Sequence, residues 1–102
     1  MNLSQKGKNN IMTIGVIGPG AVGTTIAIEL QQAYPDTLLI GKQKNTLNYF
    51  PENGHQPKTI SVTPYQDITQ PLDIVFIAVK TYQLESVITQ LSPIIHEETI
   101  II

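Results

Sequence analysis

Residues 14–23 read IGVIGPGAVG and contain the pattern G-x-G-x-x-G, formed by Gly18, Gly20 and Gly23. The β-rich run 12–17, MTIGVI, leads directly into this pattern. Small and apolar residues at helical spacing follow, namely Gly23, Ile26, Ala27 and Leu30. The stretch therefore predicts a buried strand, a tight turn and a helix that packs against a sheet.

A glycine-rich turn between a strand and a helix is typical of sites that bind the pyrophosphate of a dinucleotide. Gly18 permits the tight turn, Gly20 lets the backbone approach the phosphates, and Gly23 allows close packing of the helix on the strand. The helix N-terminus adds free N–H groups and a partial positive charge. Since Pro19 has no N–H, the amides from Gly20 onward must carry the binding. The alternative is a plain turn that uses glycine for its geometry alone.

The rest of the chain alternates strands with helices. Further strands are predicted at 37–41, 58–63, 73–79 and 98–102, a second helix at 82–91, and at most a short helix at 44–50. This order predicts an α/β fold, a Rossmann-like parallel sheet with strand order 3-2-1-4-5. Residues 12–102 would form one dinucleotide-binding domain, and 1–11 an N-terminal extension outside it. Because no loop follows the last strand, we expect a piece of a longer protein, truncated before a C-terminal substrate domain.

Composition narrows the function classes. The 102 residues carry a formal net charge of −2 and no cysteine, and all six basic residues are lysine. Disulfides and thiolate nucleophiles are thereby excluded, which fits a cytoplasmic protein. Neither nucleic acid nor a membrane is an expected partner, because there is no basic excess and no long apolar run. His55 and His96 are isolated, so we expect ordinary surface histidines and no metal site.

The end of the second predicted strand distinguishes NADP from NAD. NAD sites place Asp or Glu there to bind the ribose 2′-hydroxyl. This sequence has Lys42 and Lys44 at that point, while Asp36 precedes the strand. A lysine attracts a 2′-phosphate, so Lys42 is predicted to select NADP, with Lys44 as an auxiliary. The alternative is that both are solvated surface lysines.

Lys80 directly follows the apolar strand 73–79, at the sheet edge where the glycine turn lies. A cation there can meet the ribose of a cofactor or the carboxylate of a substrate. The position alone leaves open a lysine that simply reaches water.

The segments TIGVIGPGAVGTTIAIEL and DIVFIAVKTYQLESVI together resemble the N-terminal domain of the ketopantoate reductase family. The resemblance covers residues 12–102, and its more specific part is the V-K-[TA]-x-Q motif after a strand. It implies NADPH-dependent reduction of 2-dehydropantoate to pantoate, a cytoplasmic step toward pantothenate and coenzyme A. The implied cofactor-binding residues are Gly18, Pro19, Gly20, Ala21, Val22, Gly23, Lys42, Lys80 and Gln83. Lys80 also has a supporting catalytic role, and Lys42 stands where the family usually has arginine.

The family's remaining catalytic groups, an asparagine after the fifth strand and a lysine and a glutamate of a helical domain, have no counterpart here. The resemblance implies a keto-acid substrate and, for the full-length protein, a homodimer. The 102-residue chain alone is expected to bind NADPH weakly and not to turn over. Two other functions stay open: a 6-phosphogluconate-type dehydrogenase for another hydroxy or keto acid, and a nucleotide-sensing module without catalysis.

Overall fold

The computed structural model describes residues 12–51, 54 and 56–102. The proposed extension, residues 1–11, and His55 lie outside the described residues. The strands are β1 (Ile14–Ile17), β2 (Leu38–Gly41), β3 (Asn45–Tyr49), β4 (Lys58–Pro64), β5 (Leu72–Ile77) and β6 (Ile95–Ile101). The helices are α2 (Ala21–Ala33) and α3 (Leu84–Leu91), with short 3-10 turns at Tyr65–Asp67 (η1), Thr81–Gln83 (η2) and Ser92–Ile94 (η3).

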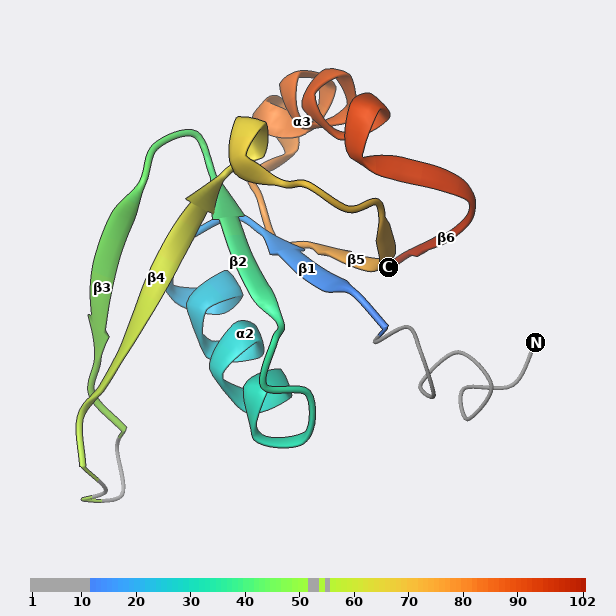
Figure 1. The fold of residues 1–102 in the computed structure, drawn as a ribbon. Helices are drawn as coiled ribbons and strands as arrows, with labels where there is room; N and C mark the ends of the chain where they lie inside the picture. Colours follow the sequence, from blue (N-terminus) through green and yellow to red (C-terminus); the bar gives the residue numbers. More distant parts are fainter. Residues whose placement is uncertain (1–11, 52–53, 55) are drawn as a thin grey trace.

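All of these strands join one sheet in the order β3-β4-β2-β1-β5-β6 (Figure 1). The predicted all-parallel order 3-2-1-4-5 is therefore wrong for this sheet. The error has one source: 44–50 was expected to form at most a short helix, but Asn45–Tyr49 is an edge strand antiparallel to β4. The other neighbours pair in parallel. The fold is thus an α/β Rossmann-like mixed sheet.

The side chains of β3 alternate, from Thr46 to Tyr49, between a solvent-exposed face and a partly buried face. Leu47 and Tyr49 are half-buried and pack against the core cluster around Val16 and Leu39. Asn45, Thr46 and Asn48 are exposed. Such alternation suits an edge strand that has one face on the core, whereas a helix would have scattered the two apolar side chains.

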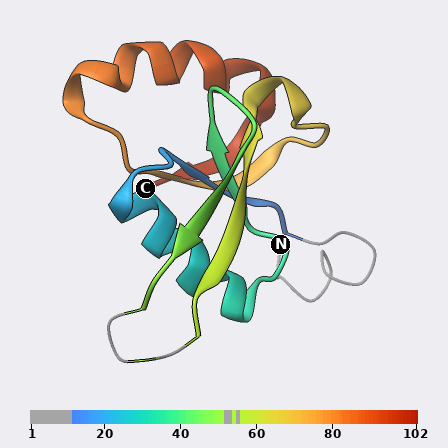
Figure 2. The ribbon, with the colours of Figure 1, turned by 90° about the vertical axis from the view of Figure 1, so that its left-hand side faces the viewer.

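The two helices cover opposite faces of the sheet (Figure 2). Ala27 and Ile28 of α2 pack with Val16 and Leu39, and α3 packs through Val87 and Leu91 with Ile17 and Ile40. Successive strand residues point to opposite faces, so the neighbours Val16 and Ile17 serve the two different cores. Neither helix in the described part of the chain combines the length and apolar character needed to cross a membrane.

The apolar side chains of α3, the second helix predicted at 82–91, are only partly buried. Val87 and Leu91 are in the core, but Leu84 and Ile88 are 39% and 57% exposed. Leu84 and Ile88 line a shallow apolar groove together with Ile77 of β5 and with Ile95 and Ile101 of β6.

His96 is exposed, as predicted, but it is not isolated. It is the second residue of β6, and its Nε2 lies 2.9 Å from Oδ1 of Asp73 in β5. The second carboxylate oxygen, Oδ2, accepts a hydrogen bond of 2.7 Å from the Thr13 N–H. Asp73 therefore links β5 to the residue before β1 and to the start of β6, at the end of the strands opposite the glycine turn.

Candidate functional site

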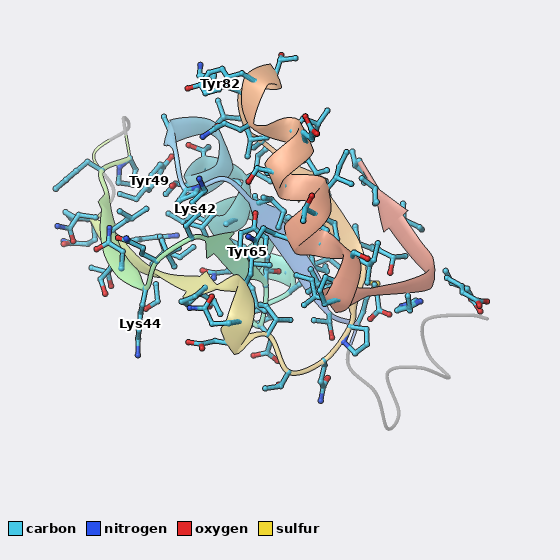
Figure 3. The ribbon with its side chains drawn as sticks, turned by 90° about the horizontal axis from the view of Figure 1, so that it is seen from above. Lys42, Lys44, Tyr49, Tyr65 and Tyr82 are labelled. Atoms are coloured by element: carbon cyan, nitrogen blue, oxygen red, sulfur yellow. The ribbon has the colours of Figure 1, made fainter. Side chains whose placement is uncertain are left out.

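A cleft of about 1130 Å³ lies at the edge where the parallel strands end, seen from above in Figure 3. Its walls come from the glycine turn, the segment after β2, the ends of β4 and β5, and the first turns of α3. None of the residues of β6 lines it. The cleft therefore lies over the sheet from β3 to β5, as expected for a ligand site in an α/β fold.

The glycine turn is packed so closely that two of its glycines cannot carry a side chain. Gly18 has φ +113°, and a Cβ there would lie 2.5 Å from the Ala78 carbonyl oxygen. A Cβ on Gly23 would lie 1.8 Å from the Gly18 carbonyl oxygen. These positions need glycine for the fold itself, because both clashes involve backbone atoms.

Gly20 differs from the other two glycines. A Cβ placed on it meets no protein atom within 4 Å, and its φ of −83° is open to any residue. The absent side chain leaves open space in the cleft instead of relieving a clash inside the protein. This space would let a ligand approach the backbone.

The first amides of α2 are unsatisfied. The first hydrogen bond of the helix runs from the Thr24 N–H to the Gly20 carbonyl oxygen at 3.0 Å, and no side chain caps the helix. The N–H groups of Ala21, Val22 and Gly23 therefore have no partner among the described residues and offer hydrogen bonds to an anion. This donor set and the open space at Gly20 fit a pyrophosphate.

Pro19 connects the glycine turn to the end of β2. A Cβ on Gly41 would lie 3.0 Å from Cγ and 3.2 Å from Cδ of Pro19, so the proline ring rests against Gly41. The Gly18 N–H donates to the Ile40 carbonyl oxygen at 3.0 Å in the same region. Together these contacts set the turn against the strand end from which Lys42 projects.

Three lysines line the cleft, namely Lys42, Lys44 and Lys80, and no Asp or Glu does among its described residues. All three are exposed, and none has an ion-pair partner in the described part of the chain. In Figure 3 Lys42 lies left of the centre of the view, whereas Lys44 points outward, away from Lys42 and Tyr65. The cleft is therefore a positive region on a chain of net charge −2. The auxiliary role of Lys44 toward a 2′-phosphate stays a prediction.

Lys80 and Gln83 are linked to each other. The Lys80 N–H donates to Oε1 of Gln83 at 3.1 Å, and the Gln83 N–H donates to the Lys80 carbonyl oxygen at 2.8 Å. Gln83 thus holds the backbone from which Lys80 projects, and both residues line the cleft. The Gln83 carboxamide nitrogen remains available for a ligand.

Tyr65 was missed by the sequence analysis. It lines the cleft, although only 8% of the residue is exposed, and burial raises the pKa of its phenol from 10.0. Tyr65 directly follows β4. The rule that singled out Lys42 and Lys80, a polar group at the carboxyl end of a strand, could have found it.

The chain matches the profile of the ketopantoate reductase PanE/ApbA family over residues 14–102. Two 2-dehydropantoate 2-reductases, from different strains of Mycobacterium tuberculosis, are 30% identical to it over 91 residues. That alignment covers 86% of this chain and 31% of theirs.

Solved structures agree. A dimeric ketopantoate reductase from Staphylococcus aureus is 47% identical and superimposes with a TM-score of 0.83, over 88% of this chain and 32% of that one. A structure from Enterococcus faecalis, 22% identical with a TM-score of 0.65, shares the fold. The chain spans about a third of the length of these relatives.

Proposed function

Because the chain belongs to the ketopantoate reductase family, we propose that its cleft binds NADPH and that the protein reduces 2-dehydropantoate to pantoate. One observation supports NADPH as the cofactor. Three lysines that have no ion-pair partner among the described residues line a cleft that begins at the glycine turn, and no Asp or Glu of the described chain lines it. When bound, NADPH supplies the hydride that reduces the ketone. The substrate and the reaction rest on the named relatives.

Different residues of the cleft bind different parts of the cofactor. The amides of Ala21, Val22 and Gly23 bind the pyrophosphate, with Gly20 leaving room for its approach and Gly18 shaping the turn. Lys42 and Lys80 provide charge on either side of that turn, and Gln83 orients Lys80. Because cationic groups and helix N-termini both favour anions, the cleft suits a ligand with several phosphates.

Lys42 is the group that selects NADPH over NADH. It follows β2 directly, where an NAD site would carry an acidic residue, and a carboxylate there would repel a 2′-phosphate. Two unit charges about 4 Å apart interact by about 4 kcal/mol near a protein surface. Since Lys42 is exposed, screening reduces this figure, and we expect the charge to change affinity by about 1–3 kcal/mol, roughly ten- to a hundredfold.

The test compares Lys42→Glu with Lys58→Glu in the purified protein. Lys58 begins β4, at the opposite end of that strand from the cleft, so the two variants share the same change in net charge. Fluorescence titration with NADPH and NADH should show the preference for NADPH lost in Lys42→Glu and retained in Lys58→Glu. An equal response of both variants would remove Lys42 from the cofactor site. Tighter binding of NADH than NADPH by the wild type would overturn the choice of cofactor.

Lys80 contacts the ribose of the cofactor and the substrate, and it supports catalysis there. Its replacement by alanine should lower turnover in the full-length protein, followed as the loss of NADPH absorbance with 2-dehydropantoate as substrate. Wild-type kinetics of Lys80→Ala would end this assignment.

The dimeric relative also supports a homodimer of the full-length protein, which sedimentation would detect.

A further inference from the structure

Tyr65 combines a core position with a place in the cleft. It opens η1 directly after β4 and belongs to the cluster that joins Ile17 and Ile40 of the sheet to Val87 of α3. Only 8% of the residue is exposed. For packing alone, phenylalanine would serve at this position equally well, so the hydroxyl needs its own explanation.

The hydroxyl of Tyr65 has no hydrogen-bond partner among the described residues. Buried tyrosines usually find one, because an unpaired polar atom is costly away from water. No side-chain oxygen or nitrogen that is sealed from solvent lacks a partner in the described part of the chain. The unpaired hydroxyl therefore reaches solvent, and Tyr65 is one of the residues that line the cleft.

The surroundings of Tyr65 indicate which half of a dinucleotide it would meet. Ile40 and Val62 line the same cleft from β2 and β4, and Val87 lines it from α3. Lys42 lies at the same part of the cleft, and Tyr65 is labelled between Lys42 and α3 in Figure 3. An apolar wall with a hydroxyl in it and a cation beside it suits a purine ring joined to a phosphorylated ribose.

We propose that Oη of Tyr65 forms a hydrogen bond with the adenosine half of the dinucleotide, in the part of the cleft beside Lys42. This assignment rests on the proposed function, since it takes the ligand to be NADPH and Lys42 to meet the adenosine 2′-phosphate. The hydroxyl can donate or accept, so either a ring nitrogen of the purine or a ribose oxygen can be its partner. Burial raises the pKa of the phenol, which keeps it neutral and able to do both.

The test uses Tyr65→Phe, which removes the hydroxyl and keeps the ring, with Tyr34→Phe as a matched control. Tyr34 lies at the end of α2, is 42% exposed and does not line the cleft. Calorimetry measures binding of three probes by the purified protein: NADPH, adenosine 2′,5′-bisphosphate and reduced nicotinamide mononucleotide. Tyr65→Phe should weaken the first two by the same factor, about two- to tenfold for one neutral hydrogen bond, and leave the third unchanged. Tyr34→Phe should leave all three unchanged.

A spectroscopic measurement adds a second readout beside the affinities, and its first part needs only the wild type. Adenosine 2′,5′-bisphosphate should perturb the near-ultraviolet absorption of one tyrosine, and this difference signal should be missing in Tyr65→Phe. No tyrosine signal on binding, equal affinities of wild type and Tyr65→Phe, or a loss confined to the nicotinamide probe would each overturn the proposal. A wild type that binds neither NADPH nor the bisphosphate would instead overturn the proposed function.

Discussion

Gly20 and Gly23 belong to one turn, but alanine should have opposite consequences at the two positions. At Gly23 the new Cβ would lie 1.8 Å from the Gly18 carbonyl oxygen, whereas ordinary contact begins at 3.4 Å. Both groups are held in the backbone, so α2 must move off the sheet. We expect a loss of about 3 kcal/mol in the free energy of unfolding, at the upper end for overpacking. For a domain of this size that lowers Tm by roughly 12–24 °C.

At Gly20 the new Cβ meets no protein atom within 4 Å. The backbone angles, φ −83° and ψ −168°, suit alanine. Alanine is the poorer N-cap by a few tenths to about 1 kcal/mol. It also restricts the unfolded chain, which stabilises by about 0.4–1 kcal/mol. Because these contributions offset each other, Tm should stay within about 4 °C of the wild type.

Cofactor binding should reverse this ranking. The methyl group of Gly20→Ala would occupy the space through which the pyrophosphate approaches the backbone. We expect NADPH affinity to fall at least tenfold, about 1.4 kcal/mol, in a protein that melts normally. Thermal unfolding by circular dichroism, with and without NADPH, measures both effects, and the stabilisation by NADPH should largely disappear in Gly20→Ala. Wild-type affinity of Gly20→Ala would refute the proposed approach of the phosphates, and a normal Tm for Gly23→Ala would refute the close packing.

Two further predictions concern stability. Asp73→Ala leaves the Thr13 N–H without its 2.7 Å partner and should lower the free energy of unfolding in urea by about 1–3 kcal/mol. His96→Ala removes only an exposed hydrogen-bond partner of Asp73 and should lower it by less than about 1 kcal/mol. Equal losses in the two variants would contradict this difference. Burial raises the pKa of Tyr65 above 10.0 in the folded protein, so Tyr65 ionises at a lower pH in the unfolded chain than in the folded one. The free energy of unfolding should therefore fall as the pH rises above 10.0. Tyr65→Phe should flatten this alkaline loss, and the wild-type-minus-variant absorbance titration at 295 nm should have its midpoint above 10.0.

Much of the glycine turn could be predicted from the sequence because its determinants are local. Gly18, Gly20 and Gly23 follow one strand and open one helix, so their spacing alone indicates which of them shapes the turn, which faces a ligand and which packs the helix. The same locality placed Lys42 and Lys80 at strand ends, since parallel strands terminate at a common edge. The roles of these lysines toward a cofactor remain predictions.

The features that the sequence analysis missed depend on contacts between distant segments. Asn45–Tyr49 becomes a strand because β4 offers it an edge to pair with, and an alternation that spans only five residues is too short to predict that pairing by itself. His96 of β6 contacts Asp73 of the neighbouring strand β5. Tyr65 lines the cleft because η1 places it against α3. The local sequence thus determined the strand–turn–helix unit and its glycines. Only tertiary packing decided the edge of the sheet, the partners of the polar side chains and the tyrosine in the cleft, because those depend on which segments meet in space.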